Sequence, residues 1–85
     1  MTYRIYGFST CPYCQKAKAL LDEEGIPYDY VDIPTQAERA AFLDARGFQG
    51  ADRTFPRIYR AKLSGEQLVG GYSHLEDEIM MELAA

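Results

Sequence analysis

The chain has 85 residues, with 9 Lys and Arg against 13 Asp and Glu and a formal net charge of −4. This length predicts one domain spanning residues 1–85. The acidic balance without a basic cluster argues against nucleic-acid binding, and no apolar run reaches the roughly 18 residues that a membrane span requires.

The first predicted element is a strand over Thr2–Phe8, a segment rich in β-branched and aromatic residues. Arg4 lies within it, and the N-terminal stretch lacks the long apolar core of a signal peptide. We therefore expect a cytoplasmic protein.

A helix is predicted from Pro12 to about Glu24, because Pro is favoured in a first helical turn and Gly25 stops the pattern. The hydroxyls of Ser9 and Thr10 are expected to cap it. Its inner face is predicted to consist of Ala17, Leu20 and Leu21.

A second strand is predicted over Tyr28–Ile33 and a second helix over roughly Gln36–Arg46. Thr35 and Glu38 have the spacing of a capping box, which marks the start of this helix. Gly47 ends it, and a short loop over 48–53 follows.

The C-terminal part of the chain predicts an antiparallel hairpin and a final helix. The hairpin pairs Arg57–Lys62 with Gln67–Val69 through a turn at Ser64-Gly65. Ser73 and Glu76 suggest a second capping box, and the inner face of the last helix is predicted to hold Leu75, Ile79 and Leu83.

The resulting order, β-α-β-α-β-β-α, predicts a thioredoxin-like α/β fold. A strand, helix and strand in succession form a right-handed parallel crossover, and the hairpin adds antiparallel strands to the same sheet. We expect four mixed strands with helices on both faces.

The chain has two cysteines, Cys11 and Cys14, separated by Pro12-Tyr13 at the predicted start of the first helix. The unpaired N–H groups and the positive end of the helix dipole stabilise a thiolate there. We assign Cys11 as an exposed nucleophile and Cys14 as a shielded resolving thiol. Two packing cysteines, or a zinc site, are the alternatives, but zinc needs four ligands and this chain offers one cysteine pair and one His.

The motif C-P-Y-C after a strand ending in Y-G-F-S-T, with T-F-P near the middle and G-G-Y near the end, resembles the glutaredoxins over almost the whole chain. The short length and the Y-G-F segment are similar to phage-type members. The resemblance implies a redox-active Cys11/Cys14 pair, a cis-proline at Pro56 facing it, and no tightly bound cofactor. It implies a glutathione site formed by Tyr13, Thr54, Phe55, Pro56, Gly71, Tyr72, Ser73 and His74. No metal ligands are expected.

The sequence departs from the family pattern at two places. Phe8 stands where many glutaredoxins have a Lys for the glycine carboxylate of glutathione, and Ser73-His74 stand where two Asp are common. We predict that Arg53 supplies the missing cation, with Arg39 or Lys16 as additional candidates.

The resemblance implies a monomeric, glutathione-dependent reductase of protein disulfides and glutathione mixed disulfides, with ribonucleotide reductase as a candidate substrate. Thioredoxin reductase as the electron source is an alternative within the same chemistry. A carrier of a glutathione-ligated [2Fe–2S] cluster is a second alternative, which Pro12 disfavours because cluster-binding relatives have a more open residue there. A non-catalytic binding module would leave the C-x-x-C unexplained.

Overall fold

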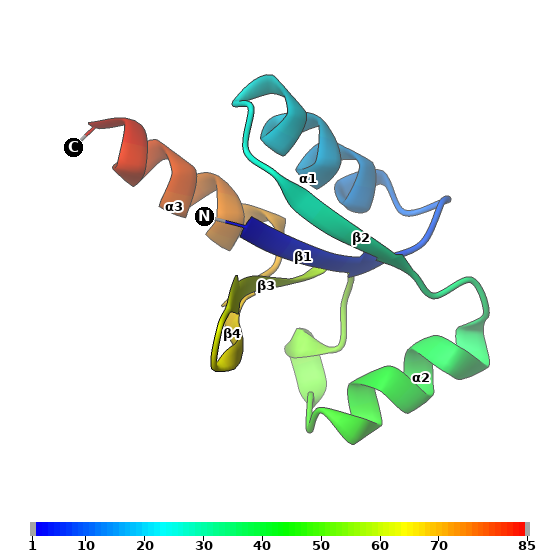
Figure 1. Cartoon of the computed structure of the whole chain (residues 1–85). Helices are drawn as coiled ribbons and strands as arrows, with labels where there is room; N and C mark the ends of the chain where they lie inside the picture. Colours follow the sequence, from blue (N-terminus) through cyan, green and yellow to red (C-terminus); the bar gives the residue numbers. More distant parts are fainter. Residues whose placement is uncertain (1, 85) are drawn as a thin grey trace.

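The structure is a computed structural model that describes residues 2–84. The first half of the chain contains β1 (Thr2–Gly7), α1 (Pro12–Glu23), β2 (Tyr28–Asp32) and α2 (Gln36–Ala45). A short 3₁₀ helix, η1 (Gly50–Asp52), leads to the hairpin of β3 (Arg57–Lys62) and β4 (Gly65–Gly70), and α3 (Tyr72–Ala84) follows (Figure 1). Apart from η1, which lies in the predicted loop over 48–53, the element order is the predicted one.

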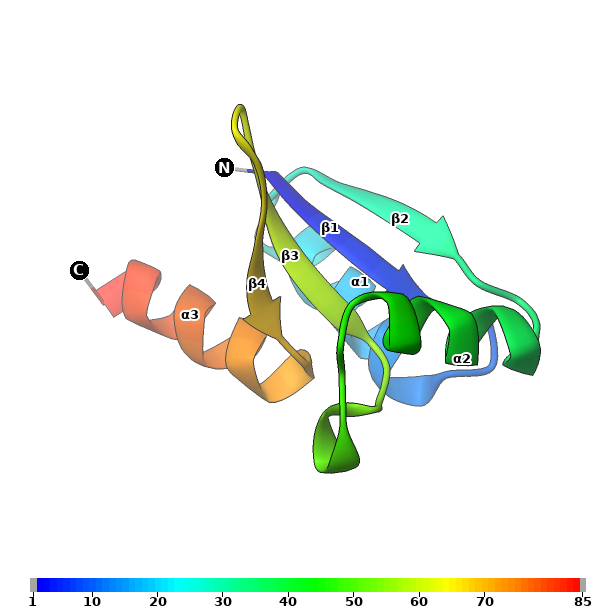
Figure 2. The same ribbon diagram turned by 90° about the horizontal axis from the view of Figure 1, so that it is seen from below.

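The strands form one mixed sheet in the order β2-β1-β3-β4. β1 and β2 are parallel, with Ile5 opposite Tyr30, and the two remaining pairings are antiparallel. Figure 2 shows the sheet between its helical layers. The thioredoxin-like fold predicted from the sequence is confirmed.

Two hydrophobic clusters fix the layers, because successive side chains of a strand point to opposite faces. On one face α1 and α3 contact each other and bury a cluster of Tyr3, Ile5, Ala17, Leu21, Ile58, Leu75 and Ile79. On the other face Tyr6, Ile33 and Tyr59 pack against Phe42, Phe48 and Phe55, beneath α2. Within residues 2–84 no helix is long and apolar enough to cross a membrane.

The starts of the helices agree only in part with the predicted caps. The Thr35 hydroxyl accepts the Glu38 N–H at 3.1 Å and donates to the Glu38 carboxylate at 2.7 Å, which confirms the capping box of α2. The prediction of Ser9 and Thr10 as caps of α1 is wrong, because the N-cap is Cys11 itself.

The final helix also differs from its prediction. It begins at Tyr72, so Ser73 lies inside the first turn, and Glu76 accepts a hydrogen bond from the Tyr72 hydroxyl. Leu75 and Ile79 are buried, but Leu83 is 66% exposed, since the last turn of α3 extends beyond the sheet (Figure 1).

Candidate active site

The two cysteines form a disulfide at the start of α1, with their Cα atoms 5.2 Å apart. Cys11 is the N-cap, and its Sγ accepts the backbone N–H of Cys14 at 3.2 Å. An N–H of the first helical turn therefore points at the sulfur that is predicted to be the nucleophile. Such a donor, together with the helix dipole, stabilises a thiolate on Cys11.

The prediction that Cys11 stays exposed is wrong for this disulfide form. Cys11 is 5% exposed and Cys14 is completely buried. The bond to Cys14 and the hydrogen bond from its N–H turn the Cys11 sulfur towards the first helical turn. The predicted order of exposure still holds, since Cys11 is the more accessible of the two.

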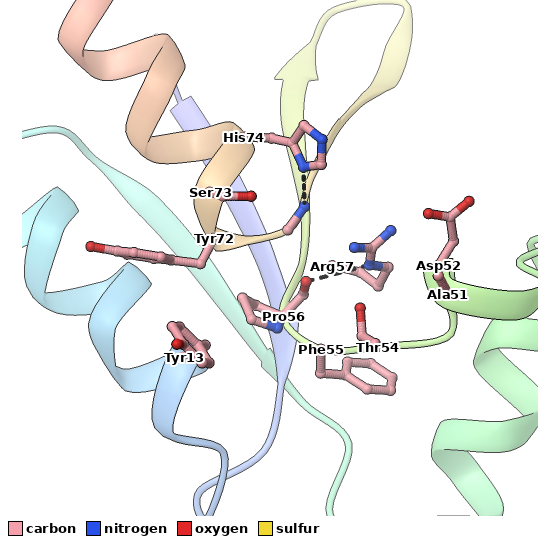
Figure 3. Close-up of a pocket in the computed structure, with 11 residues that line it drawn as sticks. Tyr13, Ala51, Asp52, Thr54, Phe55, Pro56, Arg57, Tyr72, Ser73 and His74 are labelled. Atoms are coloured by element: carbon pink, nitrogen blue, oxygen red, sulfur yellow. Dashed lines mark hydrogen bonds between the residues drawn. The ribbon is translucent and has the colours of Figure 1, made fainter.

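A cavity of about 500 Å³ lies beside the start of α1 (Figure 3). Tyr13, one of the two residues between the cysteines, forms one side, and the centre of its ring lies 5.7 Å from that of Tyr72. The cavity brings together every residue of the predicted glutathione site except Arg53: Tyr13, Thr54, Phe55, Pro56, Gly71, Tyr72, Ser73 and His74. Ala51, Asp52 and Arg57 complete its lining.

Segments far apart in the chain meet around this cavity because of the sheet topology. The Thr54–Pro56 segment enters the central strand β3, and the Gly71–His74 segment leaves its neighbour β4. Both segments therefore lie at the same end of the sheet (Figure 3). The Phe55–Pro56 peptide bond is cis, as predicted.

The start of α3 has a compact geometry that depends on glycine. Gly70 has a φ of 130°, and a Cβ there would lie 2.6 Å from Nδ1 of His74. The same nitrogen accepts the Gly71 N–H at 3.2 Å, so His74 takes up one free donor of this turn. The next N–H groups of the first turn have no partner within the helix.

Arg57 is a cavity residue that the sequence prediction missed. It is 5% exposed, and its guanidinium donates a hydrogen bond to the Pro56 carbonyl at 3.3 Å. The guanidinium carbon also lies 5.1 Å from the centre of the Phe48 ring. No carboxylate forms an ion pair with it in the part of the chain that the structure describes. Burial lowers the pKa of the guanidinium, and Asp52 partly offsets this effect. Its position directly after the T-F-P motif was the available signal.

Arg53 lines a second cavity of about 420 Å³, which shares Thr54 and Phe55 with the first. Phe8 and Arg39 line it too, and the Arg39 guanidinium lies 4.0 Å from the centre of the Phe8 ring. The Arg53 guanidinium is held by Asp44 at 2.8 Å. Lys16 does not line this cavity, and its ammonium lies over the Tyr13 ring, 4.8 Å from the ring centre.

Comparison with known proteins identifies the family. The glutaredoxin family model matches residues 4–63. The chain belongs to the glutaredoxin family. Glutaredoxin 1 of Rickettsia felis is 40% identical over 60 residues, which cover 68% of this chain and 56% of that protein. The chain thus spans little more than half the length of this curated relative.

Two solved structures match along nearly their whole length. Glutaredoxin 1 from Francisella tularensis, complexed with cacodylate, has a TM-score of 0.78 and 26% identity, covering 99% of this chain and 98% of that one. Reduced Escherichia coli glutaredoxin has a TM-score of 0.68 and 34% identity, with full coverage of both chains.

Glutaredoxins are thiol–disulfide oxidoreductases, and the Cys11–Cys14 pair provides the two thiols of a dithiol member. Between Thr2 and Ala84 no group of three or more His, Cys, Asp or Glu side chains is arranged to hold a metal ion.

Proposed function

We propose that this protein is a cytoplasmic, monomeric, glutathione-dependent oxidoreductase that reduces protein disulfides and glutathione mixed disulfides. The observation that carries the proposal is the Cys11–Cys14 disulfide at a helix N-terminus, with Tyr13 between the cysteines lining the main cavity. Membership of the glutaredoxin family supports glutathione as the reductant, because this family uses it.

The two cavities suit the two charged ends of glutathione. The peptide would pair with the backbone of Phe55 as an added strand. Its γ-glutamyl carboxylate would lie at the Gly71–His74 helix start, where Arg57 and free N–H groups favour an anion. Its glycine carboxylate would lie near Arg39 and Arg53, which replace the cation absent at Phe8.

The chemistry would start at Cys11, whose thiolate is favoured by the N–H of Cys14. Its attack on a glutathione mixed disulfide joins Cys11 to the glutathione sulfur and releases the substrate thiolate. A second glutathione thiolate then attacks the glutathione sulfur, and glutathione disulfide leaves. For a protein disulfide, Cys14 attacks the Cys11 mixed disulfide and forms the Cys11–Cys14 bond, which two glutathione molecules reduce.

The natural electron acceptor is a further part of the proposal. Ribonucleotide reductase is a candidate because the resemblance to the glutaredoxins implies it. Thioredoxin reductase is the alternative electron donor, favoured by the Phe8 and Ser73-His74 departures. A glutathione-ligated [2Fe–2S] carrier is the weaker alternative, and visible absorbance of the purified protein would indicate it.

The test is reduction of a glutathione mixed disulfide, coupled to NADPH through glutathione reductase. We expect Cys11→Ser to abolish turnover, because it removes the attacking sulfur, and Cys14→Ser to retain it, because glutathione resolves the intermediate. An inactive wild type that still reduces insulin with thioredoxin reductase would reject the glutathione-dependent function.

A further inference from the structure

The sulfur of Cys14 is buried behind the active site. Cys14 of α1 is completely buried, and Gly7 at the end of β1 lies against it. A Cβ on Gly7 would stand 2.6 Å from the Cys14 sulfur. A negative charge on this sulfur would be costly here, because burial disfavours the charged form of a thiol.

One hydroxyl reaches this region from the neighbouring strand. The same Gly7 Cβ would stand 2.9 Å from the Tyr30 hydroxyl, so this oxygen and the Cys14 sulfur are at most about 5.5 Å apart, the sum of the two distances. Tyr30 lies on β2 opposite Ile5, which directs its ring towards α1. Glycine at position 7 leaves the space that both groups occupy.

The Tyr30 hydroxyl lacks a hydrogen-bond partner. Among the buried side-chain oxygen and nitrogen atoms of residues 2–84, it is the one without a partner in this disulfide form. Leaving such a group unsatisfied lowers the stability of the fold, so an unused donor beside a redox-active sulfur needs an explanation.

We propose that the Tyr30 hydroxyl donates a hydrogen bond to the Cys14 sulfur once the Cys11–Cys14 disulfide is reduced, and so stabilises the Cys14 thiolate. In the disulfide the sulfur is held by its bond to Cys11. Reduction frees it to rotate about the Cα–Cβ bond of Cys14 towards the hydroxyl.

The donor acts at a defined step, and this inference rests on the proposed dithiol chemistry. A glutathione thiolate attacks the Cys11 sulfur and a new S–S bond joins the two. The Cys11–Cys14 bond breaks, its electron pair stays on Cys14, and the Tyr30 O–H stabilises that leaving thiolate. In the reverse direction the same bond raises the thiolate fraction of Cys14, which attacks the Cys11 mixed disulfide.

The charges around Tyr30 favour donation over ionisation. Burial, together with the nearby Asp32 on β2, raises the pKa of the Tyr30 hydroxyl, so it keeps its proton. The Lys18 ammonium of α1 also faces Tyr30, 4.4 Å from the centre of its ring.

The test uses a background with one thiol. The chain has two cysteines, so in Cys11→Ser the remaining thiol is Cys14, whose thiolate can be titrated by the ¹³C chemical shift of its Cβ without interference from the seven tyrosines. We expect Tyr30→Phe in this background to lower the thiolate-to-thiol ratio of Cys14 about tenfold at a given pH, because the substitution removes the hydrogen bond that stabilises the thiolate. The titration needs neither glutathione binding nor turnover, so it separates this inference from the proposed function.

Tyr28→Phe is the matched control, since Tyr28 lies on the same strand but its hydroxyl donates to Asp22 at the surface. It should leave the Cys14 titration unchanged. An unchanged titration in Tyr30→Phe, or equal shifts in both variants, would overturn the inference. Circular dichroism of each variant excludes unfolding as the cause of a shift.

Discussion

Arg57 differs from the other arginines of this protein in its surroundings. Arg4, Arg46, Arg53 and Arg60 each pair with a carboxylate, and the half-buried Arg39 donates to the Ile33 and Pro34 carbonyls. Arg57 alone among the described arginines is buried, and it lies among aromatic and backbone atoms at the cavity wall. A buried cation without an ion-pair partner costs stability, and retaining one suggests that a ligand supplies the missing anion. We therefore expect removal of this charge to weaken the binding of glutathione without lowering the unfolding free energy.

Arg57→Met tests this expectation, because it removes the charge and keeps a long side chain. We expect the KM for a glutathione mixed disulfide to rise about tenfold or more with little change in kcat, since a charge-assisted hydrogen bond contributes about 1.5–3 kcal/mol. The unfolding free energy should not fall. Coupled-assay kinetics and urea denaturation measure the two quantities.

Arg53→Met serves as the comparison, because Arg53 lines the second cavity and not the first. It should raise KM if the glycine carboxylate binds beside Phe8, as the sequence predicts. An unaltered KM in Arg57→Met, together with a loss of stability, would show that Arg57 serves packing alone.

These side chains also show what the sequence could and could not predict. Tyr13, Phe55 and Tyr72 belong to the short motifs C-P-Y-C, T-F-P and G-G-Y, and the structure places all three at one cavity. Arg57 was missed because its burial depends on Phe48 and Gly71, two distant segments that meet only in the fold. The Tyr30 hydroxyl was missed for the same reason, since Gly7 and Cys14 approach it from other elements.

The helix α2 depends on the cap at its first turn more than α1 and α3 do. Only Leu43 of its residues is buried, so tertiary packing supports it weakly. Thr35→Ala removes the acceptor for the Glu38 N–H, and we expect the unfolding free energy to fall by about 1 kcal/mol. Urea denaturation measures the change. Thr35→Ser should keep most of the stability, and equal stability of the Ala variant would contradict the prediction.

Element types and order were predictable because each helix and strand has its own local signal of period, cap and turn residue. The boundaries of α1, α2 and β3 agree with the prediction to within one residue. The failures are at places where tertiary contacts decide. His74, rather than Ser73, occupies the space beside Gly70, and α3 starts earlier than its apparent capping box predicts.

A polar cluster joins β1, β4 and the end of α2 on the face opposite α1. The Glu66 carboxylate accepts hydrogen bonds from Tyr6 at 2.6 Å, Arg46 at 2.8 Å and Arg4 at 3.0 Å. The Arg46 guanidinium also donates to the Tyr6 hydroxyl at 3.2 Å. This cluster holds α2, which carries the Arg39 side of the second cavity, against the sheet.

The cluster predicts how the stability of the protein depends on pH. Burial opposes ionisation of Glu66, but hydrogen bonds from Tyr6, Arg46 and Arg4 outweigh it and lower its pKa below the ordinary value of 4.5. Because the folded pKa is lower than the unfolded one, this stabilisation is fully present above the unfolded pKa and is lost as pH falls through the folded pKa.

Glu66→Gln should lower the unfolding free energy at neutral pH by about 1–3 kcal/mol, and the variant should lose less of its unfolding free energy on acidification than wild type. Urea denaturation over a pH series measures both effects. Asp29→Asn, which removes an exposed partner of Arg4 at 3.4 Å, should change stability by less than about 1 kcal/mol. If the unfolding free energies of Glu66→Gln and wild type fall equally as the pH is lowered, another group controls the acid sensitivity.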